Sequence, residues 1–226
     1  MFCLSGNGSF ITKDYFPPLD VSSGEWEIGL VDLMTYNSIP NIEKGVNDKF
    51  YYGNDYCITI EEGAYEIEDL EKLLQSKMGE GLSLKANNNT LKAEIECKEK
   101  IDFTKQGTIA SLLGFNSKVL NPFVKNVSDR PVSIMKVDVI RVECNIVRGS
   151  YNNGEEGHVI HEFYPNVGPG YKMIEAPNTI IYLPVNVKRI NNVTICLKDQ
   201  NGDRINLRNE GVSIRLHIRE RNGACI

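Results

Sequence analysis

Histidine is scarce in this chain of 226 residues, which has only 3, and its 6 cysteines never form a C-x-x-C pair. A cupin-type metal centre needs several clustered histidines, so this scarcity argues against one. Basic residues are not in excess either, because 25 Lys and Arg stand against 30 Asp and Glu, for a formal net charge of −5. A dedicated nucleic-acid-binding protein would have a basic excess. We therefore expect no specific nucleic-acid partner.

Long apolar runs are also missing. No stretch approaches the roughly 20 apolar residues that a helix needs to cross a bilayer. The opening MFCLSGNGSF is too polar for a secretory signal peptide. We therefore expect no membrane insertion and no secretion through a signal peptide. The six cysteines are then expected to be reduced, several of them packed as small apolar residues.

The sequence does show apolar and polar residues alternating with a period of two. The clearest case is PVSIMKVDVIRVECNIV, residues 131–147, which has neither Gly nor Pro after its first residue. It predicts one long β-strand, with a bulge or bend near residues 136–140 where the apolar parity switches. GVSIRLHIRER, residues 211–221, predicts a final strand with one apolar and one basic face.

A helical period is clear in one place. In residues 63–78 the apolar side chains recur at helical spacing, with acids early and lysines later, which predicts an amphipathic helix. Residues 107–115, GTIASLLGF, predict a short second helix that ends at Gly114. Polar turn residues predict two hairpins, one around Asn-Asn-Asn in residues 82–97 and one around Asn-Gly in residues 191–207.

These patterns amount to about eight to ten strands with one or two short helices, and no linker or change of composition divides them. We expect an all-β fold, a sandwich of two antiparallel sheets, of which the jelly roll is one topology. We expect residues 1–226 to form a single domain and residues 1–20 to be an N-terminal arm.

The residues that could carry chemistry do not form a motif. His158 and His161 are three apart, and in an alternating strand that spacing points them to opposite faces, so they cannot share a metal ion. The acid pair Glu155 and Glu156 follows Gly in a turn, where solvation explains it without a glycosidase pair. We therefore predict no catalytic residue, no metal, no cofactor and no enzymatic activity.

Several turn-rich segments contain aromatic residues and prolines that solvation does not explain. The segments are DYFPPLD, FYPNVGPGYK and IIYLPV. Exposed apolar and aromatic residues often mark a surface that contacts another protein. The basic residues of the strands are scattered among acids, which favours contacts between subunits over a nucleic-acid groove.

A series of blocks from about Glu25 to Glu220 carries a family resemblance. Among them are EWEIGLVDLMTYNSIPNI, ITIEEGAYEIEDLEKLL, LKAEIECKEKIDFTKQGTIASLLGF, GHVIHEFYPNVGPGYKMIE and VSIRLHIRE. In these blocks the chain resembles the minor capsid, or penton, proteins of Polinton (Maverick) elements and of the related adintoviruses.

The resemblance implies a single jelly roll that assembles as a homopentamer at the fivefold vertices of an icosahedral capsid. Its partners would be copies of itself and a double-jelly-roll major capsid protein. Its location would be the virion, assembled in the nucleus or cytoplasm of a host cell. Charged residues of the long strand, such as Arg141 and Glu143, would then pair across subunits. The residues expected at subunit interfaces are Trp26, Tyr36, Arg141, Arg148, Tyr151, Tyr164 and Tyr171.

Two other interpretations stay open. A β-sandwich of the tumour-necrosis-factor or lectin kind would bind a ligand or receptor as a trimer or a monomer. A copy of the capsid gene domesticated by a host would keep the fold and do something else. The number of copies in the assembled protein separates the first of these from a penton.

Overall fold

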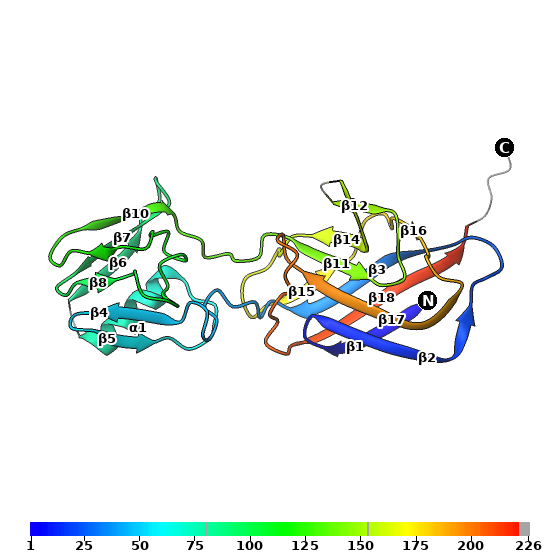
Figure 1. The fold of residues 1–226 in the computed structure, drawn as a ribbon, viewed down its shortest axis with the longest axis horizontal. Helices are drawn as coiled ribbons and strands as arrows, with labels where there is room; N and C mark the ends of the chain where they lie inside the picture. Colours follow the sequence, from blue (N-terminus) through cyan, green and yellow to red (C-terminus); the bar gives the residue numbers. More distant parts are fainter. Residues whose placement is uncertain (80, 153, 222–226) are drawn as a thin grey trace. The chain divides into compact units, whose positions relative to one another are not determined.

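The computed structural model describes residues 1–79, 81–152 and 154–221 (Figure 1). The chain packs into two compact units, the first Met1–Ile39 with Val137–Ile226 and the second Pro40–Lys136. Each unit has its own hydrophobic core. We expected one domain. That expectation fails because the second unit begins and ends between two strands of the first, with no change of composition to mark it.

Two antiparallel sheets form the first unit. One has the strand order β1-β18-β3-β15, with β16 also paired to β3, and the other has the order β14-β11-β17-β2. The first sheet consists of β1 (Phe2–Asn7), β18 (Gly211–Glu220), β3 (Trp26–Tyr36), β15 (Lys172–Glu175) and β16 (Leu183–Pro184). The second consists of β14 (Val159–Phe163), β11 (Ile140–Cys144), β17 (Arg189–Lys198) and β2 (Phe10–Asp20). The hairpin of β12 (Ser150–Asn152) and β13 (Glu155–Gly157) connects β11 to β14.

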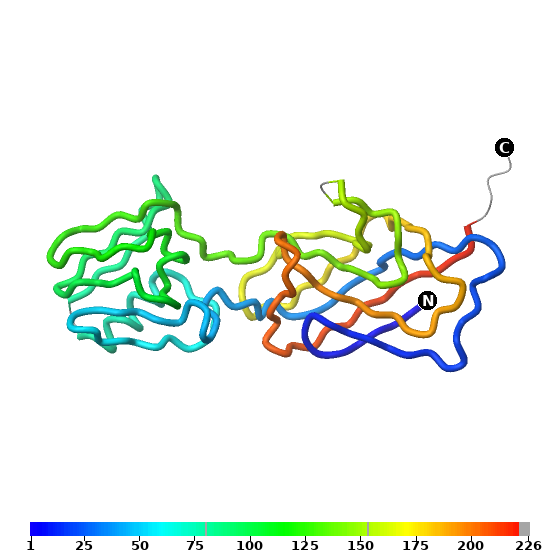
Figure 2. Tube along the Cα trace, viewed as in Figure 1, coloured from blue at the N-terminus to red at the C-terminus, as the bar shows by residue number. Residues whose placement is uncertain are grey.

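The strand order of these sheets is that of a jelly roll. Without β16 and the hairpin, each sheet has four strands. Numbered along the chain, they read first, eighth, third and sixth in one sheet, and fifth, fourth, seventh and second in the other. The first and last strands, β1 and β18, therefore pair, and they run side by side in Figure 2. The expected all-β sandwich is confirmed, and its topology is the jelly roll.

Residues 1–20 belong to this sandwich and are not an arm, which corrects the sequence-based expectation. β1 pairs with β18 along its whole length, and β2 pairs with β17. Phe2, Leu4 and Ile11 lie in the core of the first unit. The polar segment SGNGSF contains the turn between β1 and β2.

The core of the first unit follows from alternation along its strands. The predicted final strand is confirmed as β18, in which Val212, Ile214 and Leu216 are buried and Arg215 and Arg219 are exposed. Burying such an apolar side chain contributes about 1.5–3 kcal/mol. The inward rows of β18 and β17, none more than 3% exposed, are Val212, Ile214, Leu216, Val193, Ile195 and Leu197.

The second unit contains two small antiparallel sheets and the helix α1 (Ile67–Met78). One sheet has the order β5-β4-β8-β9 and the other β10-β7-β6. Their bounds are β4 (Lys49–Tyr52), β5 (Tyr56–Thr59), β8 (Ile101–Asp102), β9 (Val119–Leu120), β6 (Leu82–Ala86), β7 (Lys92–Cys97) and β10 (Asn126–Pro131). The helix predicted in residues 63–78 is confirmed as α1, and the hairpin predicted in residues 82–97 as β6 and β7. No helix among the described residues is long and apolar enough to span a membrane.

The segment 131–147 does not form one long strand, contrary to the sequence-based prediction. After β10 the residues 132–139 are irregular, and only then does β11 begin. The parity switch marks the passage between the two units. Val132 and Ile134 pack against the core of the second unit, whereas Val137 lies in the core of the first. The period of two alone could not reveal that the two halves of this segment contribute to different cores.

Residues 107–115 form turns and not the predicted short helix. The N–H of Leu113 donates to the carbonyl oxygen of Ile109 at 3.1 Å, which closes a turn that is not continued. Gly114 ends the segment, as predicted, with a φ of 78°. A Cβ at this position would lie 2.2 Å from the carbonyl oxygen of Arg130, so the close approach of two backbones requires glycine here.

Replacing Gly114 with Ala is expected to destabilise the protein by about 2–3 kcal/mol, because Ala resists the left-handed backbone and its Cβ meets a carbonyl oxygen. Gly45→Ala is the matched control. Gly45 has a φ of 76°, but a Cβ added there would have no atom within 4 Å. The control should lose only about 1 kcal/mol. Urea unfolding followed by circular dichroism measures both, and equal losses would contradict the role of the close approach.

Candidate interaction surfaces

The outer face of the β1-β18-β3-β15 sheet carries a row of ion pairs between β18 and β3. Arg215 Nε donates to Asp32 Oδ1 at 2.9 Å, and Arg219 Nε donates to Glu27 Oε1 at 2.6 Å. The hydrogen bond to Asp32 raises the pKa of Arg215. We call Arg215 and Arg219 the arginine row. The basic face that suggested contacts between subunits thus has acidic partners within the chain.

Charged side chains on the outer face of the β14-β11-β17-β2 sheet also form ion pairs within the chain. Arg141 Nε donates to Glu162 Oε1 at 2.8 Å, and Lys198 Nζ lies 2.8 Å from Glu143 Oε2. The hydrogen bond to Glu143 raises the pKa of Lys198. Arg141 and Glu143 were expected to pair across subunits, whereas both have partners within the chain.

The loop 164–171 lies beside the end of β3 and is anchored there by Asn37. Asn37 Nδ2 donates to the carbonyl oxygen of Val167 at 2.7 Å. The backbone N–H of Asn37 donates to the carbonyl oxygen of Tyr171 at 2.9 Å. The N–H of Gly170 donates to the carbonyl oxygen of Asn37 at 2.7 Å. Three of the expected interface tyrosines border this loop, with exposed fractions of 46%, 72% and 70%. They are Tyr36, Tyr164 and Tyr171.

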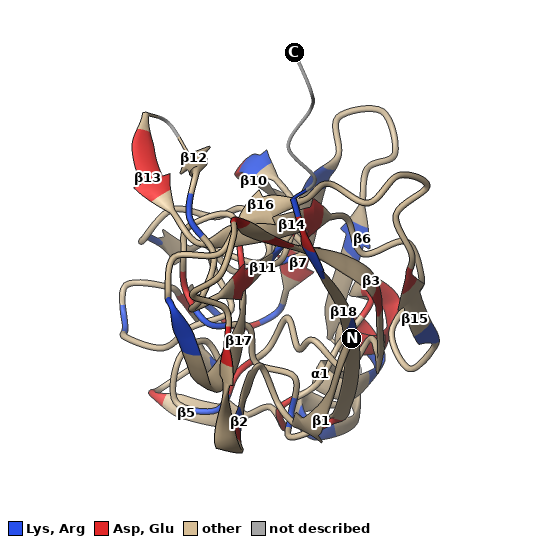
Figure 3. Ribbon diagram, turned by 90° about the vertical axis from the view of Figure 1, so that its right-hand side faces the viewer, with Lys and Arg blue, Asp and Glu red and all other residues tan. Residues whose placement is uncertain are grey.

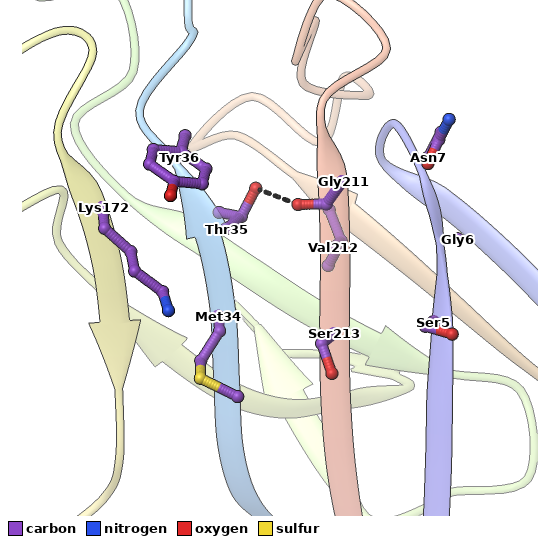
Figure 4. A pocket seen from close by; sticks show the side chains of 10 residues that line it. All are labelled: Ser5, Gly6, Asn7, Met34, Thr35, Tyr36, Lys172, Gly211, Val212 and Ser213. Carbon is purple, nitrogen blue, oxygen red and sulfur yellow. Dashed lines mark hydrogen bonds between the residues drawn. The ribbon is translucent and has the colours of Figure 1, made fainter.

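A shallow groove crosses the ends of β1, β18, β3 and β15 (Figure 4). Tyr36 and Lys172 stand on one side of it, and Ser5 stands on the other. Thr35 Oγ1 donates to the carbonyl oxygen of Gly211 at 3.0 Å, which ties β3 to β18 within the groove. Among the described lining residues, Lys172 is the one charged side chain. The groove can pack against an extended segment, but it offers no carboxylate or histidine for acid–base catalysis.

The other expected interface residues do not join this group. Trp26 packs against the core, and its Nε1 donates to the carbonyl oxygen of Ser23 at 2.8 Å. Arg148 and Tyr151 are exposed at the start of the β12–β13 hairpin. Arg141 lies on the opposite sheet, in its ion pair. The structure therefore distributes the seven predicted residues over several places and brings only the loop tyrosines together.

Phe16 is 99% exposed; it lies in the segment DYFPPLD noted above but is not among the seven expected interface residues. On β2, Asp14 pairs with Asn192 of β17. The next pair is Leu19 with Ile190, so four residues of β2, Phe16 among them, lie opposite one residue of β17 and interrupt the pairing. The signal was present in YFPPLD, because two consecutive prolines cannot donate to a strand ladder.

His158 and His161 have separate partners. His161 Nε2 lies 2.8 Å from Glu175 Oε1, whereas His158 Nδ1 lies 2.6 Å from the carbonyl oxygen of Val147. Within the part of the chain that the structure describes, no three His, Cys, Asp or Glu side chains gather in a way that could hold a metal ion.

The described cysteines are free thiols. Cys97 and Cys144 are buried, as expected of thiols packed as small apolar residues, whereas Cys3 and Cys57 are exposed. Burial raises the pKa of the Cys144 thiol to about 11. Cys225 lies outside the described residues.

The fold has a counterpart among solved structures. The crystal structure of the mavirus penton protein aligns with 95% of this chain and 92% of its own, with a TM-score of 0.50 and 9% sequence identity. The chain shares the fold of the mavirus penton protein. A chain of the cryo-EM structure of the Sputnik virophage aligns with 96% of this chain and 97% of its own, with a TM-score of 0.44 and 11% identity. No family model matches the chain, and no curated protein matches its sequence.

Replacing Asn37 with Ala should release the loop 164–171 and cost about 1–2 kcal/mol, because the carbonyl oxygen of Val167 loses its partly buried donor. Hydrogen–deuterium exchange at the Gly170 amide should become faster, and urea unfolding measures the stability. Asn178→Ala, at an exposed asparagine between β15 and β16, is the control and should change neither. Unchanged exchange in the Asn37 variant would refute the anchoring role.

Thiol labelling of the native protein at pH 8 should modify Cys3 and Cys57 quickly and spare Cys97 and Cys144 until the protein unfolds. The raised pKa of Cys144 keeps its thiol protonated at this pH, and burial also excludes the reagent. Mass spectrometry of peptides from timed samples locates the label. Labelling of Cys144 as fast as that of Cys3 would contradict the buried position.

Proposed function

We propose that this chain is a structural capsid protein, the penton subunit of an icosahedral virion. In this role five copies form a ring at each fivefold vertex. The observation that carries the proposal is the alignment with a penton protein, which extends over 95% of the chain and so includes both units. A match to the jelly roll alone would be weaker support, because that topology serves many functions.

The two outer sheet faces suit a subunit that must stay soluble before it assembles. Their principal charges are already paired within the chain, so assembly does not have to neutralise them. Exposed aromatic side chains, which protein interfaces favour, are then one source of attraction between copies. From the expected interface set we retain Tyr36, Arg148, Tyr151, Tyr164 and Tyr171.

A ring of identical copies places constraints on these contacts. Each copy must contact its two neighbours through two different patches, because a head-to-tail arrangement closes a ring only with such heterologous interfaces. Each interface should bury on the order of 1,000 Å² or more to be stable. Tyr36, Tyr164 and Tyr171, the tyrosines that border the loop 164–171, form one candidate patch.

The sequence resemblance supports a finer assignment, to the penton proteins of Polinton elements and adintoviruses. On this assignment the rest of the shell consists of a double-jelly-roll major capsid protein, and the chain is found in the virion. Such a role is one of assembly, and it requires no catalytic residue, metal or cofactor.

Mass photometry of the purified full chain over a range of concentrations, with electron microscopy of the particles, tests the ring. We expect particles of five copies with fivefold symmetry, either alone or on addition of the major capsid protein. Particles of three copies would overturn the proposal and support a ligand-binding sandwich. A chain that stays monomeric under both conditions would also overturn it.

The double substitution Tyr164→Ala and Tyr171→Ala should weaken the association of copies by on the order of 10-fold or more, because truncating interface aromatics removes much of the binding energy. Tyr56→Ala is the matched control, since Tyr56 is 63% exposed but belongs to the second unit. Circular dichroism verifies that each variant folds. Equal association of all variants would exclude the loop tyrosines from the interface.

A further inference from the structure

The β12–β13 hairpin projects from the first unit and carries two neighbouring acids. Glu155 and Glu156 are exposed, and among the described residues no Lys or Arg forms an ion pair with either. Figure 3 shows the acidic β13 at the outer end of the hairpin. Tyr151 lies directly opposite Glu156 in the hairpin register and is 71% exposed. The hairpin therefore presents two negative charges beside one aromatic ring.

The arginine row has the opposite character. In its ion pairs the acid lies beneath and the base lies above: Asp32 is 9% exposed and Arg215 is 47% exposed. Glu27 is 15% exposed, against 51% for Arg219. Although each pair is neutral, a molecule that approaches this face meets guanidinium groups first. Both groups keep free donors for a second carboxylate. The Cζ of Arg219 already lies 3.6 Å from the centroid of the Tyr182 ring, so Arg215 is the group that can accept a further aromatic ring.

We propose that the β12–β13 hairpin of one copy binds the arginine row of a second copy. Glu155 and Glu156 pair with Arg215 and Arg219, and Tyr151 packs against a guanidinium group. This contact rests on the proposed ring and names one of its interfaces.

Charge complementarity favours a second copy as the occupant. The start of the hairpin adjoins the same sheet, since the N–H of Arg148 donates to the carbonyl oxygen of Pro184 in β16, which pairs with Glu27 of β3. Within one chain, no ion pair among the described residues joins Glu155 or Glu156 to the arginine row. Both patches belong to the first unit, and they differ from each other. Two different, complementary patches on one subunit are what a head-to-tail ring requires.

Charge reversal with rescue tests the contact in the full chain. Glu155→Lys with Glu156→Lys should weaken ring association by on the order of 100-fold, because like charges then face each other. Glu27→Arg with Arg219→Glu reverses the row while it retains an ion pair within the chain, and it should weaken association similarly. The combination of all four substitutions should restore association to within about 10-fold of the wild type. Mass photometry over a concentration series measures each chain.

Glu61→Lys with Glu62→Lys is the matched control, an adjacent acid pair in the second unit, and it should leave association unchanged. The hairpin acids make no ion pair with any described residue, so their reversal should not affect folding, which circular dichroism verifies. If the variant Glu27→Arg with Arg219→Glu does not fold, the variant Glu155→Lys with Glu156→Lys alone tests the contact.

Rings that are unaffected by reversal of the hairpin acids would overturn this contact and leave the penton assignment standing. Failure of the four-substitution chain to recover, when both double variants are weakened, would overturn direct pairing. If the row variant instead loses only its binding to the major capsid protein, that protein is the occupant and the proposal is wrong. A wild-type chain that never forms rings would overturn the proposed function and this contact together.

Discussion

Two sheets held face to face by alternating apolar side chains support every other feature of the first unit. Because Ile214 and Leu216 of β18 point inward, the intervening Arg215 points outward, opposite Asp32 of β3. A register shift between Arg215 and Leu216 then brings Glu27 of β3 opposite Arg219. The core thus determines which charges meet on the outer face. The position of the loop 164–171 depends on this core too, since the loop connects β14 in one sheet to β15 in the other.

Local periodicity predicted local structure well. The final strand, α1 and the hairpin at residues 82–97 were correct, because each belongs to one core and its pattern has one cause. The prediction failed at residues 131–147, where Val132 and Val137 fall on opposite parities of the run and serve two cores. Which core a side chain enters is decided by partners distant in sequence, and a period of two does not identify those partners.

The candidate surfaces were predicted in part. Exposed tyrosines could be expected from segments rich in Gly and Pro, and Tyr164 and Tyr171 are indeed exposed. That Asn37 holds their loop beside Tyr36 depends on a contact across 130 positions of the chain, which no motif encodes. The in-chain partners of Arg141 and Arg215 were equally inaccessible, because strand register decides them.

The place of the second unit in the strand order has a consequence for how such a protein can evolve. β3 and β11 are consecutive strands of the jelly roll, and the whole of Pro40–Lys136 is inserted between them. Every sheet belongs to one unit or the other, and so does every buried core residue. Selection on the core of the jelly roll therefore does not act on the core of the inserted segment. A lineage can exchange that segment as a cassette, or let it drift, while the scaffold that carries it is conserved.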